Sequence, residues 1–129
     1  MLADYATVAD GKLTLVGAGF DWCHVGGPVT FGIGVLVHVP WTATNTPHPW
    51  VLRVVDSDGQ PVAGGDGVPL QISDRFELGR PPGVQPGSSM TVPLAFNLQG
   101  LVLVGDTRYL VEFDIDDALV ARSGFATRG

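Results

Sequence analysis

The sequence is poor in the residues on which several classes of function depend. A single cysteine, Cys23, excludes an intramolecular disulfide framework and fits a reducing compartment. Lysine and arginine number only 7 against 13 aspartates and glutamates, and the formal net charge of −6 disfavours nucleic-acid binding, which needs clustered basic side chains. No apolar run approaches the roughly 20 residues that cross a membrane as a helix. We therefore expect no nucleic-acid partner and no membrane partner.

Residue usage also bears on where the protein works. The first residues lack the basic segment and apolar run of a secretory signal, so we expect a cytoplasmic protein. Six arginines stand against one lysine, amid many glycines, alanines, valines and prolines. This bias is typical of a bacterial gene of high GC content, so we expect a bacterial origin.

Length and periodicity predict the fold class. The 129 residues suit one domain, residues 1–129, since a domain typically holds roughly 100–150 residues. Strong helix formers are scarce, whereas 18 glycines and 10 prolines interrupt the chain. Apolar and polar residues alternate with period two along most of the chain, and Asp10-Gly11 predicts a hairpin turn. The sequence therefore predicts an all-β protein, a single antiparallel β-sandwich of about eight strands.

The alternation and the turn residues also place individual strands. We expect strands at 2–9, 12–18, 30–39, 50–55, 70–78, 90–98, 108–115 and 118–127, with a loop over 21–29. Asp74 interrupts an apolar face and predicts a kink or a strand break, because an unpaired buried carboxylate is costly. Pro93 cannot donate to a ladder, so its strand is predicted to lie at an edge or to present that position outward. Asp116-Asp117 predicts the turn between the last two strands.

Several motifs spread over nearly the whole chain resemble those of an uncharacterised bacterial family of short β proteins. They are Leu2-x-Asp4-x-Ala6-x-Val8-x-x-Gly11-Lys12-Leu13, Gly17-x-Gly19, Pro40-Trp41 with Asn45, Asp56-x-Asp58-Gly59-x-Pro61, and Gly79-Arg80-Pro81-Pro82-Gly83 leading to Val92-Pro93-Leu94. The resemblance implies a fold similar in outline to immunoglobulin-like or C2-like sandwiches. It implies no activity.

Aspartates that follow two strands raise the question of calcium. Calcium takes six to eight oxygen ligands, and C2-like sandwiches gather carboxylates from loops at one end. The candidate ligands are Asp56, Asp58, Asp114, Asp116 and Asp117. Aspartate also initiates turns by bonding its own backbone, and 11 aspartates are spread through this chain. We therefore expect turn formers and no metal, and we keep a calcium-dependent C2-like module as a weaker alternative.

Cysteine and histidine offer little for catalysis or for a transition metal. Cys23-His24, His38 and His48 lack the short fixed separations of zinc ligands. Neighbouring residues on an extended chain point opposite ways, so Cys23 and His24 are poorly placed as nucleophile and base. The sequence contains no Gly-x-Ser-x-Gly elbow and no phosphate-binding loop with its Lys-Ser/Thr. We expect a protein that is not an enzyme and needs no cofactor.

Four residues are candidates for contact with a partner or ligand. The expected strand 50–55 is apolar on both faces, which leaves Val51 to be covered, and Leu36 lies outward beside the small Gly32 and Gly34. Apolar patches on a surface usually mark contacts, so we expect a homodimer or an unidentified protein partner, unless another strand of the same chain covers these positions. The loop tryptophans Trp22 and Trp41 suggest the alternative of a small-ligand or carbohydrate-binding sandwich.

Overall fold

The computed structural model describes residues 1–64 and 66–129, and in this part of the chain it contains ten strands and one short 3-10 helix. The elements are β1 (Leu2–Ala3), β2 (Tyr5–Ala9), β3 (Lys12–Val16), β4 (Trp22–His24), β5 (Val29–Val39), η1 (Trp41–Ala43), β6 (His48–Asp56), β7 (Gln71–Phe76), β8 (Met90–Leu101), β9 (Arg108–Ile115) and β10 (Ala118–Arg128). The all-β prediction is confirmed. No helix within the described ranges is long and apolar enough to span a bilayer.

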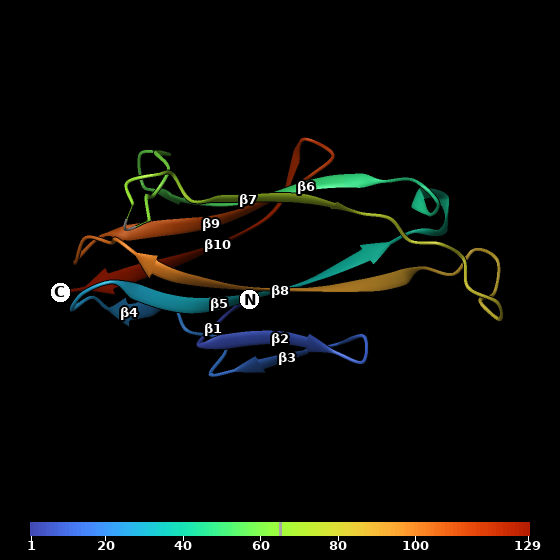
Figure 1. Cartoon of the computed structure of the whole chain (residues 1–129), viewed down its shortest axis with the longest axis horizontal. Helices are drawn as coiled ribbons and strands as arrows, with labels where there is room; N and C mark the ends of the chain where they lie inside the picture. The colour runs from blue at the N-terminus through green and yellow to red at the C-terminus, as the bar shows by residue number, and fades with distance from the viewer. Residues whose placement is uncertain (65) are drawn as a thin grey trace.

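The strands form three sheets, where the sequence predicted one sandwich of about eight antiparallel strands. A three-stranded sheet has the order β1-β5-β8, a five-stranded sheet has the order β4-β10-β9-β6-β7, and β2 and β3 form a hairpin of their own. Figure 1 shows β6, β7, β9 and β10 of the five-stranded sheet above the three-stranded sheet and the hairpin at the bottom. One pair is parallel, because β4 inside the expected loop 21–29 runs alongside the end of β10.

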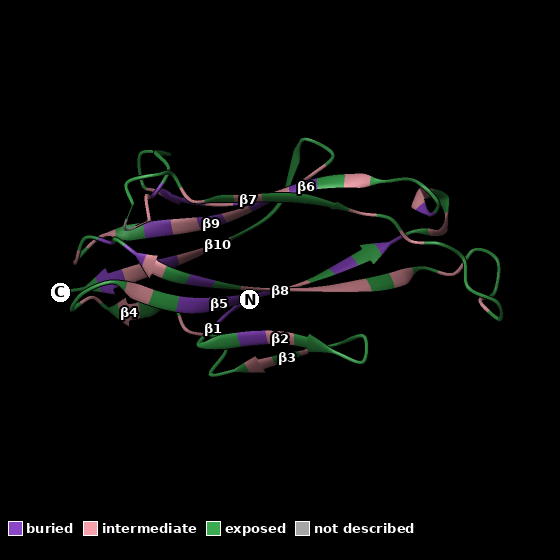
Figure 2. Cartoon of the chain, in the orientation of Figure 1, coloured by how far each residue is buried: buried purple, intermediate pink, exposed green. Residues whose placement is uncertain are grey.

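The hydrophobic core lies between the two larger sheets. Inward side chains of β5, such as Phe31 and Ile33, alternate with outward ones, as period two requires. Phe31 contacts Phe125 of the five-stranded sheet with ring centroids 5.3 Å apart, and Trp50 stacks on Phe113 at 5.7 Å. Figure 2 shows buried segments on the strands of the two larger sheets and mostly exposed residues in the turns.

The hairpin of β2 and β3 covers the outer face of the three-stranded sheet. Its turn is the predicted one, with Asp10 and Gly11 at φ 53° and 69°. Gly32 and Gly34 of β5 lie directly beneath it, since a Cβ on Gly34 would stand 2.6 Å from Cδ2 of Leu15. The chain's own hairpin therefore occupies the space beside these glycines that the sequence had left open to a partner.

Four local predictions can be compared with the structure. The expected strand 2–9 is divided at Asp4, so that β1 joins β5 and β2 enters the hairpin. Asp74 does not break its strand, because β7 is an edge strand on which that carboxylate is exposed. Pro93 lies on β8 at the edge of its sheet, and Asp116 and Asp117 form the last turn with φ 53° and 63°. The last two predictions are confirmed.

Candidate functional site

One side of the molecule has two strands whose outer edges are unpaired. β1 pairs with β5 only at Gly32 and Ile33, and Met1 bonds Gly34, so that none of the residues described pairs with 35–39 on that edge. β4 pairs with β10 only at 126–128, so residues 118–125 also have a free edge within the described part of the chain. We define the free edge of 35–39, the free edge of 118–121 and the space between them as the open side.

A groove runs along the open side between the two sheets. It consists of three adjoining pockets of about 110, 260 and 130 Å³, and each shares lining residues with the next. The central pocket is lined by Val35, Leu36, Val37, His38, Phe113, Ile115, Val120 and Ala121. Because nearly all of these side chains are apolar, the groove favours apolar groups over charged ones.

Exposed apolar side chains border this groove. Leu36 on β5 and Val120 on β10 line the central pocket, and each is 54% exposed. Leu119 is 47% exposed but stands opposite Asp114, on the outer face of the five-stranded sheet. The prediction that Leu36 faces outward is confirmed, and the hairpin does not bury it. The exposure of Val120 was not predicted, although the run from Ala118 to Ala121 breaks the alternation, and the structure has a β-bulge there.

The far end of the groove is closed by a histidine bound on both ring nitrogens. Nδ1 of His48 lies 2.8 Å from Oδ2 of Asp116, and Nε2 lies 2.7 Å from the carbonyl oxygen of Ala43. Both partners are acceptors, so both nitrogens must donate, which is the protonated imidazolium. These bonds, first that to Ala43 and then that to Asp116, raise the pKa of His48 above its usual value. His48 therefore has no free nitrogen to act as a base or a metal ligand.

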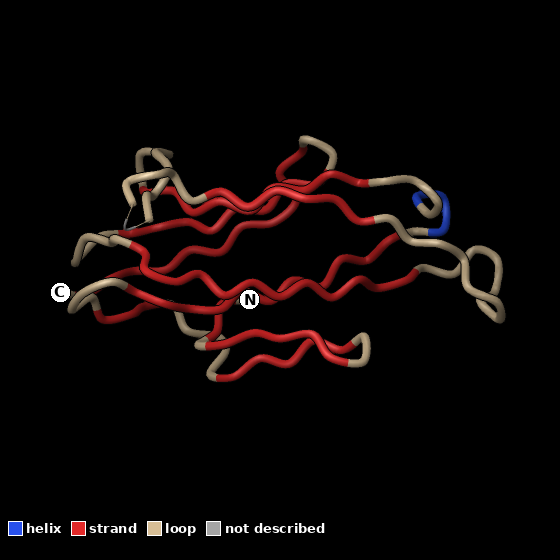
Figure 3. Tube along the Cα trace, in the orientation of Figure 1, coloured by secondary structure: helices blue, strands red, loops and turns tan. Residues whose placement is uncertain are grey.

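The two candidate tryptophans do not form a common binding surface. Trp22 lies on β4 at one end of the molecule (Figure 1), and Trp41 lies in the short helix at the other end (Figure 3). An arginine lies over each ring: Arg128 is 4.4 Å from the Trp22 ring centroid, and Arg80 is 3.9 Å from that of Trp41. The two tryptophans therefore do not form a single stacking cleft.

Arg80 also joins two of the motifs that the sequence had placed far apart. Its Nε donates to Oγ1 of Thr44 at 2.7 Å, and Nη2 donates to the carbonyl oxygen of Trp41 at 3.1 Å. The N–H of Asn45 donates to the carbonyl oxygen of Leu78 at 2.7 Å. The Gly79-Arg80 segment and the Pro40-Trp41 segment are therefore packed together at one end of the sheets, in a structural role that the sequence analysis did not assign to Arg80.

Val51 does not join Leu36 in one apolar patch. It lies on β6 of the five-stranded sheet, half-buried, with Ser73 and Asp114 as its neighbours on the two adjacent strands. Leu36 belongs to the other sheet. Val55, which lies on the same face of β6 as Val51, is buried and pairs with Pro61 of the same chain. The chain itself therefore covers most of the β6 face that was expected to need a partner.

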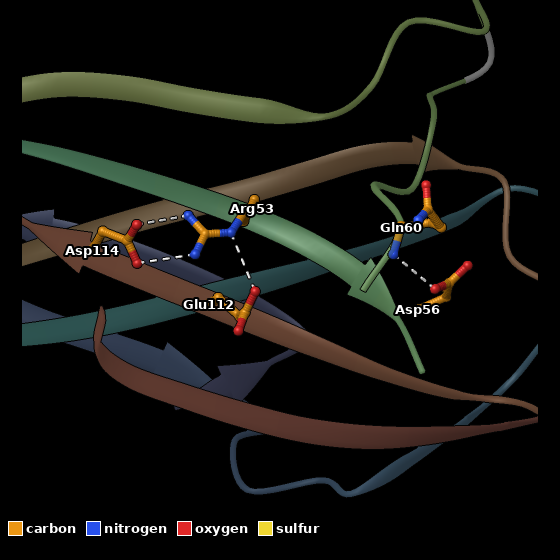
Figure 4. A network of polar contacts seen from close by, with 5 residues as sticks. All are labelled: Arg53, Asp56, Gln60, Glu112 and Asp114. Atoms are coloured by element: carbon orange, nitrogen blue, oxygen red, sulfur yellow. Dashed lines mark hydrogen bonds and ion pairs between the residues drawn. The ribbon is translucent and has the colours of Figure 1, made fainter. Parts of the chain in front are cut away.

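The candidate calcium ligands are separated, and three of the five carboxylates already accept hydrogen bonds within the chain. Asp56 accepts the N–H groups of Asp58 and Gln60, both at 2.9 Å, and Asp114 binds Arg53 through both carboxylate oxygens, as Figure 4 shows. Asp56 stands opposite Tyr109 and Trp50 opposite Ile115, so Asp56 and the Asp116-Asp117 turn lie at opposite ends of β9, roughly 20 Å apart at about 3.4 Å per residue. The five aspartates therefore do not converge, and the residues described contain no cluster of three or more metal-ligating side chains.

The cysteine and the two remaining histidines likewise do not form a nucleophile–base pair. Cys23 on β4 is half-buried between the exposed Trp22 and His24, which confirms that Cys23 and His24 point opposite ways. Burial raises the pKa of the Cys23 thiol, which disfavours the nucleophilic thiolate. Nδ1 of His38 lies 3.2 Å from Oγ1 of Thr91 on the neighbouring strand. These residues give no basis for nucleophilic chemistry.

Comparison with known proteins supports the family resemblance but adds no activity. No curated protein and no solved structure matches the chain. A family described as a family of unknown function, DUF6941, matches residues 1–127. Since the match covers almost the entire chain, the protein belongs to this family of unknown function.

Proposed function

We propose that the protein is a non-enzymatic binding module that acts as an accessory subunit of a larger assembly, and that the open side is its contact surface. The observation that carries this proposal is the pair of exposed apolar side chains, Leu36 and Val120, that line a groove between two unpaired strand edges. Exposed apolar surface beside unpaired backbone is a liability that proteins normally cover. A bound polypeptide would cover both features at once.

Other features of the chain support a binding role over an enzymatic one. The ring nitrogens of His48 are both used in structural hydrogen bonds, and the carboxylate of Asp114 is held by Arg53. The groove offers apolar contacts and backbone groups, which suit recognition of a polypeptide better than chemistry on a small polar substrate. An immunoglobulin-like or C2-like outline remains part of this proposal.

Site-specific photo-crosslinking in the native cell tests the proposal. A benzophenone amino acid is placed at Leu36 or Val120 on the open side, and at Thr14 or Ser73 as matched exposed controls on other faces. We expect a discrete adduct from positions 36 and 120 and none from positions 14 and 73. Equal labelling from all four positions, or no adduct from the open side, would overturn the proposal.

A further inference from the structure

The free edge of β5 continues a ladder that β1 has begun. The N–H of Gly34 donates to the carbonyl oxygen of Met1 at 2.8 Å, and the nitrogen of Met1 donates to the carbonyl oxygen of Gly34 at 2.7 Å. Alternate residues of a strand direct their backbone groups to the same side, so Leu36 and His38 direct theirs to the side that Met1 occupies. The N–H and C=O groups of Leu36 and His38, four in all, therefore point toward the open side. They are placed to bond a strand that continues β1.

The groove beneath this edge lies where the side chains of a longer strand would be. Leu2 of β1 stands opposite Ile33 and fills the core at that level, being only 2% exposed. Residues opposite Val35, Val37 and Val39 would point inward in the same way, because directly opposed residues share a face. The three pockets of the groove are lined by these valines, one after another along β5. The space is thus suited to alternate side chains of one added strand.

The β5 edge lacks the protection that the edges of β7, β8 and β10 carry. β8 has Pro93, β7 has the charged pair Asp74 and Arg75, and β10 has a bulge at 119–121 followed by Arg122. Each of these devices discourages the addition of a further strand. Residues 35–39 of β5 contain no proline, no Asp, Glu, Lys or Arg, and no register shift. An unprotected, regular edge is what strand addition requires.

We infer that the open side binds an extended segment of a partner protein, which adds as a strand along residues 35–39, antiparallel to β5 and in line with β1. The inference rests on the proposed function and specifies what its contact surface recognises. Apolar side chains at three alternate positions of the segment enter the groove opposite Val35, Val37 and Val39. The two residues between them face outward beside Leu36 and His38 and tolerate polar side chains.

A partner protein fits this edge better than a second copy of the chain does. In a two-fold pairing of β5 with β5 that matches Leu36 to His38, Pro40 of the copy would fall opposite Gly34, where Met1 already lies. Each copy also carries a formal charge of −6, so like-charge repulsion opposes a dimer. A separate extended segment that stops before Met1 meets neither obstacle.

Two N-terminal extensions of equal composition test the register. In the full chain, Thr-Val-Thr-Val-Thr-Val placed before Met1 puts its valines opposite Val35, Val37 and Val39, facing the groove. The control Val-Thr-Val-Thr-Val-Thr puts threonines there and valines outward. We expect the first extension to raise the melting temperature by about 5 °C over the control. We also expect it to slow amide exchange at Leu36 and His38, on the order of tenfold.

The same two extensions connect the edge to the partner in the cell. The groove-filling extension should abolish the cross-linked adduct from Val120, and the control extension should leave it in place. Equal melting temperatures and unprotected amides at Leu36 and His38 would overturn strand addition, even where the adducts from the open side persist and the proposed function stands. An adduct of twice the chain's mass would identify a second copy as the occupant and overturn the choice of a partner protein.

Discussion

The side-chain amide of Asn97 makes two hydrogen bonds with the backbone of Ala6. The N–H of Ala6 donates to Oδ1 at 3.0 Å, and Nδ2 donates to the carbonyl oxygen of Ala6 at 2.7 Å. Asn97 lies on β8 and Ala6 on β2, so this pair fixes the hairpin to the outer face of the three-stranded sheet. Gly32 lies beside the same contact, since its missing Cβ would stand 2.8 Å from Oδ1 of Asn97.

Gly32→Ala should destabilise the protein more than Gly34→Ala. A Cβ at Gly32 would stand 2.7 Å from the backbone nitrogen of Ala6, which cannot move unless the hairpin moves with it. A Cβ at Gly34 would meet only the flexible ends of Leu13 and Leu15. We expect a loss of about 1–3 kcal/mol for Gly32→Ala and a smaller loss for Gly34→Ala, measured by urea unfolding. Equal losses for the two variants would contradict this account of hairpin docking.

Stability should fall as pH rises because of His48. Its folded-state pKa lies above the unfolded value of about 6.5, so its stabilisation is fully present below that pH and is lost as pH rises through the folded-state pKa. We expect the free energy of unfolding to fall by about 0.5–1 kcal/mol over this pH range. The loss is small because Asp116 is 53% exposed and solvent screens its pairing with His48. Melting curves of wild type and His48→Gln from pH 5.5 to 9 measure this. If His48→Gln kept the same pH dependence of stability as the wild type, a group other than His48 would be its cause.

Arg53 and Asp114 should show a measurable coupling. Nη1 and Nη2 of Arg53 donate to the two carboxylate oxygens at 2.8 and 3.1 Å, and both side chains are less than one-third exposed. We expect a double-mutant cycle of Arg53→Met and Asp114→Asn to give about 1 kcal/mol. A cycle of Arg53→Met with Asp117→Asn serves as the control and should give a coupling near zero. Similar values from both cycles would mean that the bidentate geometry contributes nothing specific.

Removal of divalent metal should leave the fold intact. Three of the five candidate carboxylates, those of Asp56, Asp114 and Asp116, already accept hydrogen bonds from the same chain. We expect excess chelator to lower the melting temperature by less than about 5 °C, which corresponds to roughly 1 kcal/mol for a chain of this size. Isothermal titration with Ca²⁺ provides an independent reading. A heat of Ca²⁺ binding that the wild type shows and Asp56→Asn lacks would contradict the prediction.

Much of the local structure could be predicted from the sequence, because local preferences decide it. Alternation in β5 and β9 separates core residues from outward ones whatever the partner strands are. Asp10-Gly11 and Asp116-Asp117 accept the positive φ values of tight hairpin turns, and Pro93 excludes a central position in a sheet. The outward position of Leu36 follows from the same alternation. Each of these features depends on a few neighbouring residues.

Only the tertiary structure decided which strands are neighbours and therefore where the site lies. The break at Asp4, the parallel pairing of β4 with β10 and the docking of the hairpin over Gly32 all depend on residues distant in sequence. Periodicity predicts which face of a strand a residue lies on but not which sheet the strand joins. It therefore could not predict that Leu36 and Val51 lie in different sheets, or that Trp22 and Trp41 lie at opposite ends of the molecule. The open side arises because β1 pairs with too few residues of β5 to cover its edge. That shortfall is a property of strand pairing, which no single segment of the sequence encodes.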